Sequence, residues 1–324
     1  SSIFLQTYRF SNDDIGKRFR YVLLKKAKEG VKVKILIDSW GAGVTNSFFT
    51  DFIACGGKVK FFEKIKFSFD VFSRNHRRNH RKLLVVDQNI SYIGSANITS
   101  HCLNWRESTL RIEGAIGGKF IEIINYDFDI SNKVYQNKRD SIAKLNIENL
   151  NIIRDVPSLR VQPVRRFFIQ AIRNAKKEVI IETPYFLPGS FLRKTLFKAA
   201  LRGVNVKIII PEHSDVMLFD ILRNKYLGRY YHKNISIYLY TPDNLHAKVF
   251  IVDGNTFFTG SSNFDYRSMR FMHEVNIAGN TDEILLLLKN HIYETLNDCV
   301  KFDYEKWKNR HFFLKIIEVL LVPL

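Results

Sequence analysis

The chain has 324 residues, of which 46% are hydrophobic, and its 50 Lys and Arg outnumber its 32 Asp and Glu, which gives a formal charge of +18. This composition excludes an intrinsically disordered chain and allows two domains of ordinary size, each with a buried core. The positive charge predicts attraction to a polyanion, either nucleic acid or an anionic membrane surface.

Cross-links and anchors are not evident in the sequence. The three cysteines have no metal-ligand spacing, and their odd number argues against a disulfide framework. The sequence contains neither the run of about 20 apolar residues that a membrane span needs nor a signal peptide. We therefore expect a protein that is soluble or peripheral on a membrane, or one whose anchor lies upstream of this chain.

The first elements alternate between strand and helix. Residues 3–10 are typical of a strand, 15–29 of a helix and 31–38 of a second strand. A helix near 47–54 and a strand at 58–62 follow. This βαβαβ order predicts a parallel sheet with helices on its faces.

A basic loop, residues 74–79, leads into the first of two similar motifs. The first is HRKLLVVDQNISYIGSAN at 80–97, and the second is HAKVFIVDGNTFFTGSSN at 246–263. In each, His is followed by Lys two residues later, then by four apolar residues, Asp and a Gly-Ser-x-Asn. Each motif predicts a buried strand at 83–86 or 249–252, a tight turn and a second strand.

The second half of the chain repeats the first, because a strand at 179–186 corresponds to the strand at 3–10 and a helix at 191–201 corresponds to the helix at 15–29. This is an internal duplication whose period is a whole domain. Between about 134 and 151 the sequence becomes polar, and we set the first domain at 1–140 and the second at 141–324.

The two ends of the chain carry further expectations. Residues 163–175 predict an amphipathic helix with no counterpart before Ile3, so we expect the chain to begin inside a longer first domain. The segment 306–324 places cations beside apolar residues. It is interpreted as a terminal helix docked on the core, with contact to a membrane interface as the alternative.

The two motifs offer the groups that attack on a phosphodiester requires. Side chains alternate along a strand, so His80 and Lys82 share a face, as do His246 and Lys248. One neutral His can attack phosphorus while the other donates a proton to the departing alkoxide, and the lysines neutralise charge on the phosphate oxygens. Each Lys would repel a metal cation held by its neighbouring His, so we expect no metal and no cofactor.

Two glutamates follow the motifs at matched distances. Glu107 lies 27 residues after His80, and Glu274 lies 28 residues after His246. We expect these carboxylates to orient the imidazoles and to support their positive charge. The alternative is that both are surface carboxylates of the next strands.

The remaining motif positions are less specific. Asp87 and Asp253 are candidate catalytic residues, but strand alternation turns them away from the histidines and favours a structural role at the turn. Asn97 and Asn263 follow a Gly that permits close backbone approach, which favours phosphate donors over turn formers.

These motifs resemble the signature of the phospholipase D superfamily, HxKxxxxD followed by GSxN, and the likeness extends over nearly the whole chain. It is strongest to bacterial cardiolipin synthases, through YRFSNDDIGKRF, RNHRKLLVVD, NWRES with RIEG, ETPYFLPG, LHAKVFIVDG and GSSNFDYRS. The resemblance implies two similar α/β domains, with mixed and largely parallel sheets, about a pseudo-twofold axis. It places one metal-free active site at their interface, so that a monomer is sufficient.

The resemblance also implies phosphatidyl transfer. One phosphatidylglycerol donates its phosphatidyl group to a histidine, glycerol leaves, and a second phosphatidylglycerol attacks to give cardiolipin. By analogy His80 is the nucleophile and His246 the acid and base, although the symmetry permits the reverse. The implied partners are anionic phospholipid and the bacterial cell membrane, reached peripherally or through an anchor outside this chain. Hydrolysis to phosphatidic acid, cleavage of nucleic acid and a catalytically inactive binding module are the alternatives.

Overall fold

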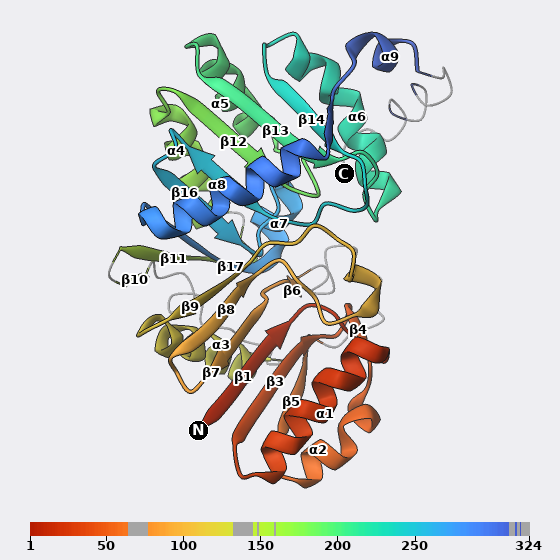
Figure 1. The fold of residues 1–324 in the computed structure, drawn as a ribbon, viewed down its shortest axis with the longest axis vertical. Helices are drawn as coiled ribbons and strands as arrows, with labels where there is room; N and C mark the ends of the chain where they lie inside the picture. Colours follow the sequence, from red (N-terminus) through yellow and green to blue (C-terminus); the bar gives the residue numbers. More distant parts are fainter. Residues whose placement is uncertain are drawn as a thin grey trace.

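The computed structural model describes residues 1–63, 77–131, 149–158 and 160–310, the backbone of 145–147, and Lys315 and Glu318. Two halves lie one above the other, with the N-terminal half at the bottom of Figure 1. The boundary expected at residue 140, residues 74–76 of the basic loop and most of the segment 306–324 lie outside the described residues.

The N-terminal half is a six-stranded sheet in the order β5-β3-β1-β7-β8-β9. Its strands are β1 (Ser2–Thr7), β3 (Lys32–Asp38), β5 (Lys58–Phe62), β7 (Leu83–Val86), β8 (Ile90–Gly94) and β9 (Thr109–Glu113), and its helices are α1 (Asp14–Lys28), α2 (Thr50–Ala54) and α3 (Ile116–Ile130). Short elements are β2 (Phe10–Ser11), β4 (Ala42–Gly43), η1 (Asn46–Phe49) and η3 (Ser100–Cys102). Helix α1 begins where the Asp13 side chain accepts a hydrogen bond from the Gly16 N–H. It ends before Gly30, whose φ of 81° suits glycine.

The C-terminal half repeats this order as β14-β13-β12-β15-β16-β17 and extends it at both edges. Its strands are β10 (Leu145–Ile147), β11 (Leu150–Asp155), β12 (Glu178–Glu182), β13 (Asn205–Pro211), β14 (Ser236–Tyr240), β15 (Val249–Val252), β16 (Thr256–Gly260), β17 (Met272–Gly279) and β18 (Cys299–Lys301). Its helices are α4 (Pro163–Asn174), α5 (Ser190–Leu201), α6 (Met217–Tyr231), α7 (Tyr266–Phe271), α8 (Asp282–Asn297) and α9 (Tyr304–Lys308).

Both sheets are mixed, as expected, but parallel pairing does not predominate. In the first half β1, β3 and β5 pair in parallel, whereas β7, β8 and β9 pair antiparallel. The second half follows the same rule at β12, β13 and β14 and at β15, β16 and β17. The reason is the short turn inside each motif, which can join only antiparallel neighbours.

One apolar cluster draws side chains from both halves. It includes Phe4 and Val85 of the first sheet and Ile251 and Val275 of the second, together with residues of α3 and α8. The two sheets are therefore stabilised by burial against shared partners and not only within each half. None of the helices in the described part of the chain is long and apolar enough to cross a bilayer.

Candidate active site

Backbone hydrogen bonds attach each motif histidine to the other half of the chain. The His80 N–H donates to the His273 carbonyl at 3.0 Å, beside the short strand β6 (Arg78–Asn79), which pairs with β17. The His246 N–H donates to the Arg106 carbonyl at 2.8 Å. The two motifs therefore approach each other across the junction between the halves.

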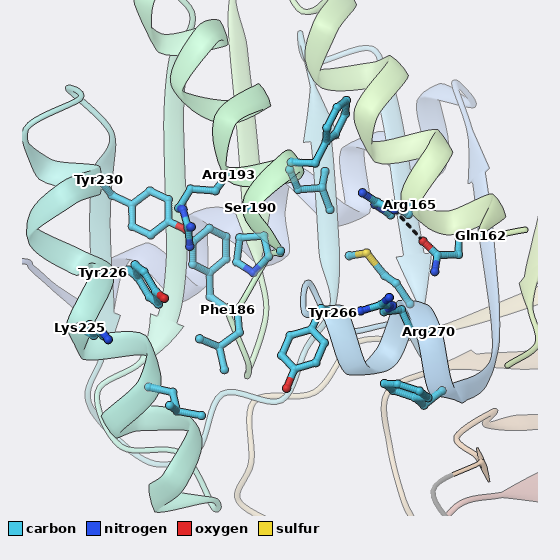
Figure 2. Close-up of a pocket in the computed structure, with 18 residues that line it drawn as sticks. Gln162, Arg165, Phe186, Ser190, Arg193, Lys225, Tyr226, Tyr230, Tyr266 and Arg270 are labelled. Atoms are coloured by element: carbon cyan, nitrogen blue, oxygen red, sulfur yellow. Dashed lines mark hydrogen bonds between the residues drawn. The ribbon is translucent and has the colours of Figure 1, made fainter. Parts of the chain in front are cut away.

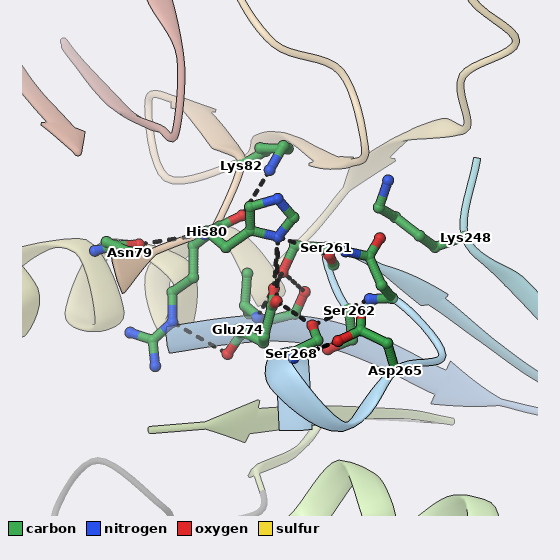
Figure 3. A network of polar contacts seen from close by, with 12 residues as sticks. Asn79, His80, Lys82, Lys248, Ser261, Ser262, Asp265, Ser268 and Glu274 are labelled. Carbon is green, nitrogen blue, oxygen red and sulfur yellow. Dashed lines mark hydrogen bonds and ion pairs between the residues drawn. The ribbon is translucent and has the colours of Figure 1, made fainter. Parts of the chain in front are cut away.

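The glutamates are exchanged between the halves. His80 Nδ1 lies 3.1 Å from Glu274 Oε1, and His246 Nδ1 lies 2.8 Å from Glu107 Oε1. Figure 3 shows the first of these pairs. Such reciprocal contact is the pattern of two units related by a twofold axis. The matched sequence spacing gave no sign of the exchange, because each Glu is bound by the histidine that is far from it in sequence.

Serines of the Gly-Ser-x-Asn segments hold these carboxylates in place. Ser261 Oγ donates to Glu274 Oε2 at 2.5 Å, and Ser268 Oγ, from α7, donates to Glu274 Oε1 at 2.5 Å. In the other half Ser95 hydrogen-bonds Glu107. Sequence reasoning missed this role, although the serine at the same position of both motifs was a usable signal.

Two buried ammonium groups lie beside the imidazoles. Lys82 Nζ donates to the His80 carbonyl at 2.7 Å, and Lys248 Nζ donates to the His246 carbonyl. Burial lowers the pKa of Lys82 to about 8 and the pKa of Lys248 to about 7, although Glu107 and Glu274 oppose the shift. Among the described residues neither Lys has a carboxylate within ion-pair distance, so both charges remain available to an anion.

Burial also sets the protonation of the histidines. It lowers the pKa of His80 to about 4, reinforced by Lys82 and opposed by Glu274, and it lowers the pKa of His246 as well. Burial alone would raise the pKa of Glu107, but His246 and Lys248 outweigh it and bring that pKa to about 2. A neutral imidazole that donates Nδ1–H to a carboxylate has its lone pair on Nε2. Each histidine is thus arranged to act through Nε2.

A cavity of about 460 Å³ opens beside His80. It is lined by Asn263, which is 6% exposed and whose Oδ1 has no partner among the described residues. Tyr8 packs edge-on against His80 with ring centroids 5.1 Å apart, and Arg267 adds a cation to the wall. Arg267 was not singled out as a site residue, because it stands outside the paired motifs.

Asn97 is placed differently from Asn263. Its Oδ1 accepts a hydrogen bond from the Arg9 N–H at 3.3 Å, and it is half-buried. Its amide N–H groups are not used in that bond, so they can still donate to an anion. Within the described part of the chain no cluster of three or more His, Cys, Asp and Glu side chains could hold a metal ion.

The two motif aspartates lie apart from this cluster. Strand β7 separates Asp87 from Lys82, and β15 separates Asp253 from Lys248. Asp87 Oδ1 accepts from the Ser2 N–H at 2.6 Å, and the Asp253 carboxylate accepts from three consecutive backbone N–H groups, those of residues 176–178. Both have φ of 52° at the turn. These contacts hold both aspartates at the turns and favour the structural role over the catalytic one.

Comparison with known proteins identifies the family. A family model described as cardiolipin synthase, PLD-like domain, matches residues 1–129 and 168–295. The chain is 31% identical over 335 residues to a cardiolipin synthase of Clostridium perfringens (strain SM101), which covers 98% of this chain and 70% of that protein. It is 31% identical over 330 residues to the major cardiolipin synthase ClsA of Bacillus subtilis (strain 168), which covers 98% and 68%.

Solved structures support the fold. Phosphatidylserine synthase of Haemophilus influenzae superimposes with a TM-score of 0.74 at 15% identity, over 99% of this chain and 89% of that chain. Polyphosphate kinase of Porphyromonas gingivalis gives 0.66 at 12% identity, over 94% and 44%. At these identities the likeness is one of fold. The family match and the two curated relatives confirm the resemblance read from the motifs: the chain belongs to the cardiolipin synthase family of the phospholipase D superfamily, and it is an enzyme of the cardiolipin synthase type.

Proposed function

We propose that this enzyme makes cardiolipin from two phosphatidylglycerol molecules through a covalent phosphatidyl-histidine and releases glycerol. The observation that carries the proposal is the pair of buried imidazoles, each held at Nδ1 by a glutamate of the other half, beside two buried lysines. Similarity to cardiolipin synthases over 98% of the chain supports the lipid substrate.

His80 is the proposed nucleophile, because it is neutral and lines the cavity that an incoming phosphate would enter. Its Nε2 attacks phosphorus, an N–P bond forms, and the bond from phosphorus to the glycerol oxygen breaks. Lys82, Lys248 and the Asn263 amide neutralise charge that builds on the non-bridging oxygens. Asn97 is proposed as the matching donor from the first motif.

His246 is the proposed acid and then base. The pKa of His246 is lowered by burial in the free protein. A bound phosphate anion and Glu107 both favour the imidazolium, so substrate binding favours protonation of His246. His246 gives that proton to the departing glycerol oxygen. It then takes a proton from the hydroxyl of the second phosphatidylglycerol, whose oxygen attacks phosphorus and displaces His80.

The proposed lipid substrate resides in a membrane. A formal charge of +18 favours an anionic bilayer surface, to which phosphatidylglycerol itself contributes. We propose that the enzyme works attached to the bacterial cell membrane and that one chain holds one complete active site, because both histidines and both glutamates come from it.

The test is product analysis with labelled phosphatidylglycerol in vesicles. Cardiolipin and glycerol in equal amounts support transfer, whereas phosphatidic acid would show that water is the acceptor. Cleavage of DNA or RNA without a lipid product would replace the proposal with a nuclease. Both His80→Ala and His246→Ala should lose nearly all turnover.

The intermediate separates the two histidine roles. In His246→Ala the first half-reaction lacks its acid and the second lacks its base, so both are slow, and the phosphatidyl adduct that does form should be on His80 and visible by mass spectrometry of the intact protein. An adduct on His246 in the His80→Ala protein would reverse the assignment.

A further inference from the structure

A second cavity, of about 630 Å³, lies in the C-terminal half between helices α4, α5, α6 and α7. Its floor is apolar and includes Phe186, Leu192 and Met269, which are buried. Figure 2 shows these helices around the space, with aromatic rings turned toward it. A cavity of this size and lining accepts an apolar chain of a ligand.

The polar groups at this cavity are cationic. Arg165 and Arg270 lie on one side and Arg193 and Lys225 on the other, while none of the described residues that line the cavity is acidic. Arg165 donates to Gln162 Oε1 at 3.0 Å, and the Arg193 guanidinium lies 4.4 Å from the Tyr226 ring centroid. Within the described residues none of the four cations is ion-paired with a carboxylate. An anion would therefore find several positive groups without a competing partner.

Two further features favour an anionic amphiphile over a free anion or a neutral apolar molecule. Helix α5 begins at Ser190 without a side-chain cap, and Gly189, Ser190 and Phe191 line the cavity, so the N-terminus of the helix, which is the positive end of its dipole, lies at the cavity. Phe191 is 43% exposed at the same mouth, and the guanidinium of Arg165 lies 5.6 Å from its ring centroid. An exposed aromatic ring flanked by arginines is typical of a surface that meets lipid.

The cavity is separate from the one beside His80. Helix α7 stands between them: Met269 and Arg270 line this cavity, whereas Arg267 and Ser268 line the other. The two cavities share no lining residue. We propose that the cavity between α4, α5, α6 and α7 binds one anionic phospholipid that is not the reacting one, with an acyl chain in the apolar floor and the phosphate held by Arg165 and Arg270.

Binding can be measured without turnover in the His80→Ala protein. The probe is lysophosphatidylglycerol, titrated below its critical micelle concentration by isothermal titration calorimetry, with lysophosphatidylcholine of the same chain as the zwitterionic comparison. We expect Arg165→Gln with Arg270→Gln to weaken binding of the anionic probe by about tenfold or more, because both phosphate partners are lost. Ser190→Trp, which fills the mouth and leaves every charge in place, should weaken it as well.

The matched control is Arg166→Gln with Lys194→Gln, an equal loss of charge from exposed positions on α4 and α5 that do not line the cavity. It should bind as the parent does, and thermal unfolding establishes that each variant is folded. Equal affinity of the cavity variants and the control would overturn the proposal, and so would equal affinity for the two lysolipids. If His80→Ala makes the cardiolipin product at a normal rate, the proposed reaction fails while the lipid site is still tested by the same titrations.

Discussion

Glu107 and Glu274 determine which ring nitrogen of each imidazole is free to react. Each carboxylate accepts Nδ1–H of a histidine, which leaves the lone pair on Nε2 and stabilises the ring when it becomes positive. Both contacts are buried, so the two charges interact in a medium that screens them weakly. We propose that these residues position the histidines and do not themselves touch the phosphate.

Replacing Glu274 with Gln should lower kcat by about 10²- to 10⁴-fold, because the amide N–H₂ can face Nδ1 and move the proton to Nε2. Glu283→Gln, an exposed change on α8, serves as the control. The measurement is steady-state cardiolipin formation. Wild-type kcat in Glu274→Gln would show that the carboxylate is not needed to orient His80.

The buried lysines predict the alkaline limb of the pH profile. In the free enzyme the ammonium of Lys248 is lost as pH rises through about 7 and that of Lys82 through about 8, because burial lowers the pKa of both. We therefore expect kcat/KM to fall above about pH 7 to 8. A bound phosphate anion raises both pKa values, so kcat should fall only at higher pH. A kcat/KM that stays flat from pH 6 to 9 would contradict this account.

At the scale of the element, the aspartate carboxylate of each motif holds the turn between its two strands in place. The Asp253 carboxylate accepts hydrogen bonds from the backbone N–H groups of residues 176–178, where β12 begins, and Gly254 follows with φ of 66°. Burial alone would raise the pKa of Asp253, but these hydrogen bonds outweigh it and lower that pKa. The hydrogen-bonded carboxylate thus contributes stability that is present above its unfolded pKa and is lost as pH falls through the lower folded one.

Asp253→Ala tests the structural role against the catalytic one. Three backbone donors would lose their acceptor, which should cost about 1 to 3 kcal/mol of unfolding free energy after water replaces part of it. The kcat of the folded fraction should stay within about threefold of wild type, since the change is remote from phosphorus. Asp129→Ala, at an exposed position on α3, is the control. A large loss of kcat without loss of stability would return Asp253 to the catalytic residues.

Individual strands and helices could be predicted from the sequence, because the apolar runs and capping residues that specify each one lie within it or next to it. The strands at 58–62, 83–86 and 249–252 lie where the apolar runs placed them, and the helix after Asp13 begins at its cap. The pairing of His80 with Glu274 was not readable, because it joins positions 194 residues apart and depends on how the halves meet. The serines that hold the glutamates are close to them in sequence, as Ser261 is to Glu274, and the serine shared by both motifs was the signal that could have found them.

At the scale of the whole molecule, one fully buried guanidinium connects the halves. Arg81 forms an ion pair with Asp127 of α3, and it donates to the carbonyls of Glu274 and Asp155 in the second sheet. The second motif has Ala247 at this position. We propose that 1–140 and 141–324 fold as mutually dependent domains, and this contact and the shared apolar cluster support the proposal.

Arg81→Met should destabilise the protein by about 3 to 5 kcal/mol, because it leaves the Asp127 carboxylate buried without its cation. Urea unfolding gives the change, and Arg111→Met, at an exposed ion pair on β9, should leave the midpoint unchanged. Adding Asp127→Asn to Arg81→Met should recover part of the loss. Unfolding of Arg81→Met at the wild-type midpoint would show that this contact does not join the halves.

The exchange of carboxylates also limits how such a chain can change over generations. After a gene duplicates within itself, either copy is ordinarily free to decay while the other keeps the ancestral task. On the proposed roles, a mutation that removes Glu107 would disable His246 of the other half, and one that removes Glu274 would disable His80, so neither copy could drift alone. On these roles selection would preserve both copies at the junction, while positions remote from the junction and from either cavity would remain free to diverge.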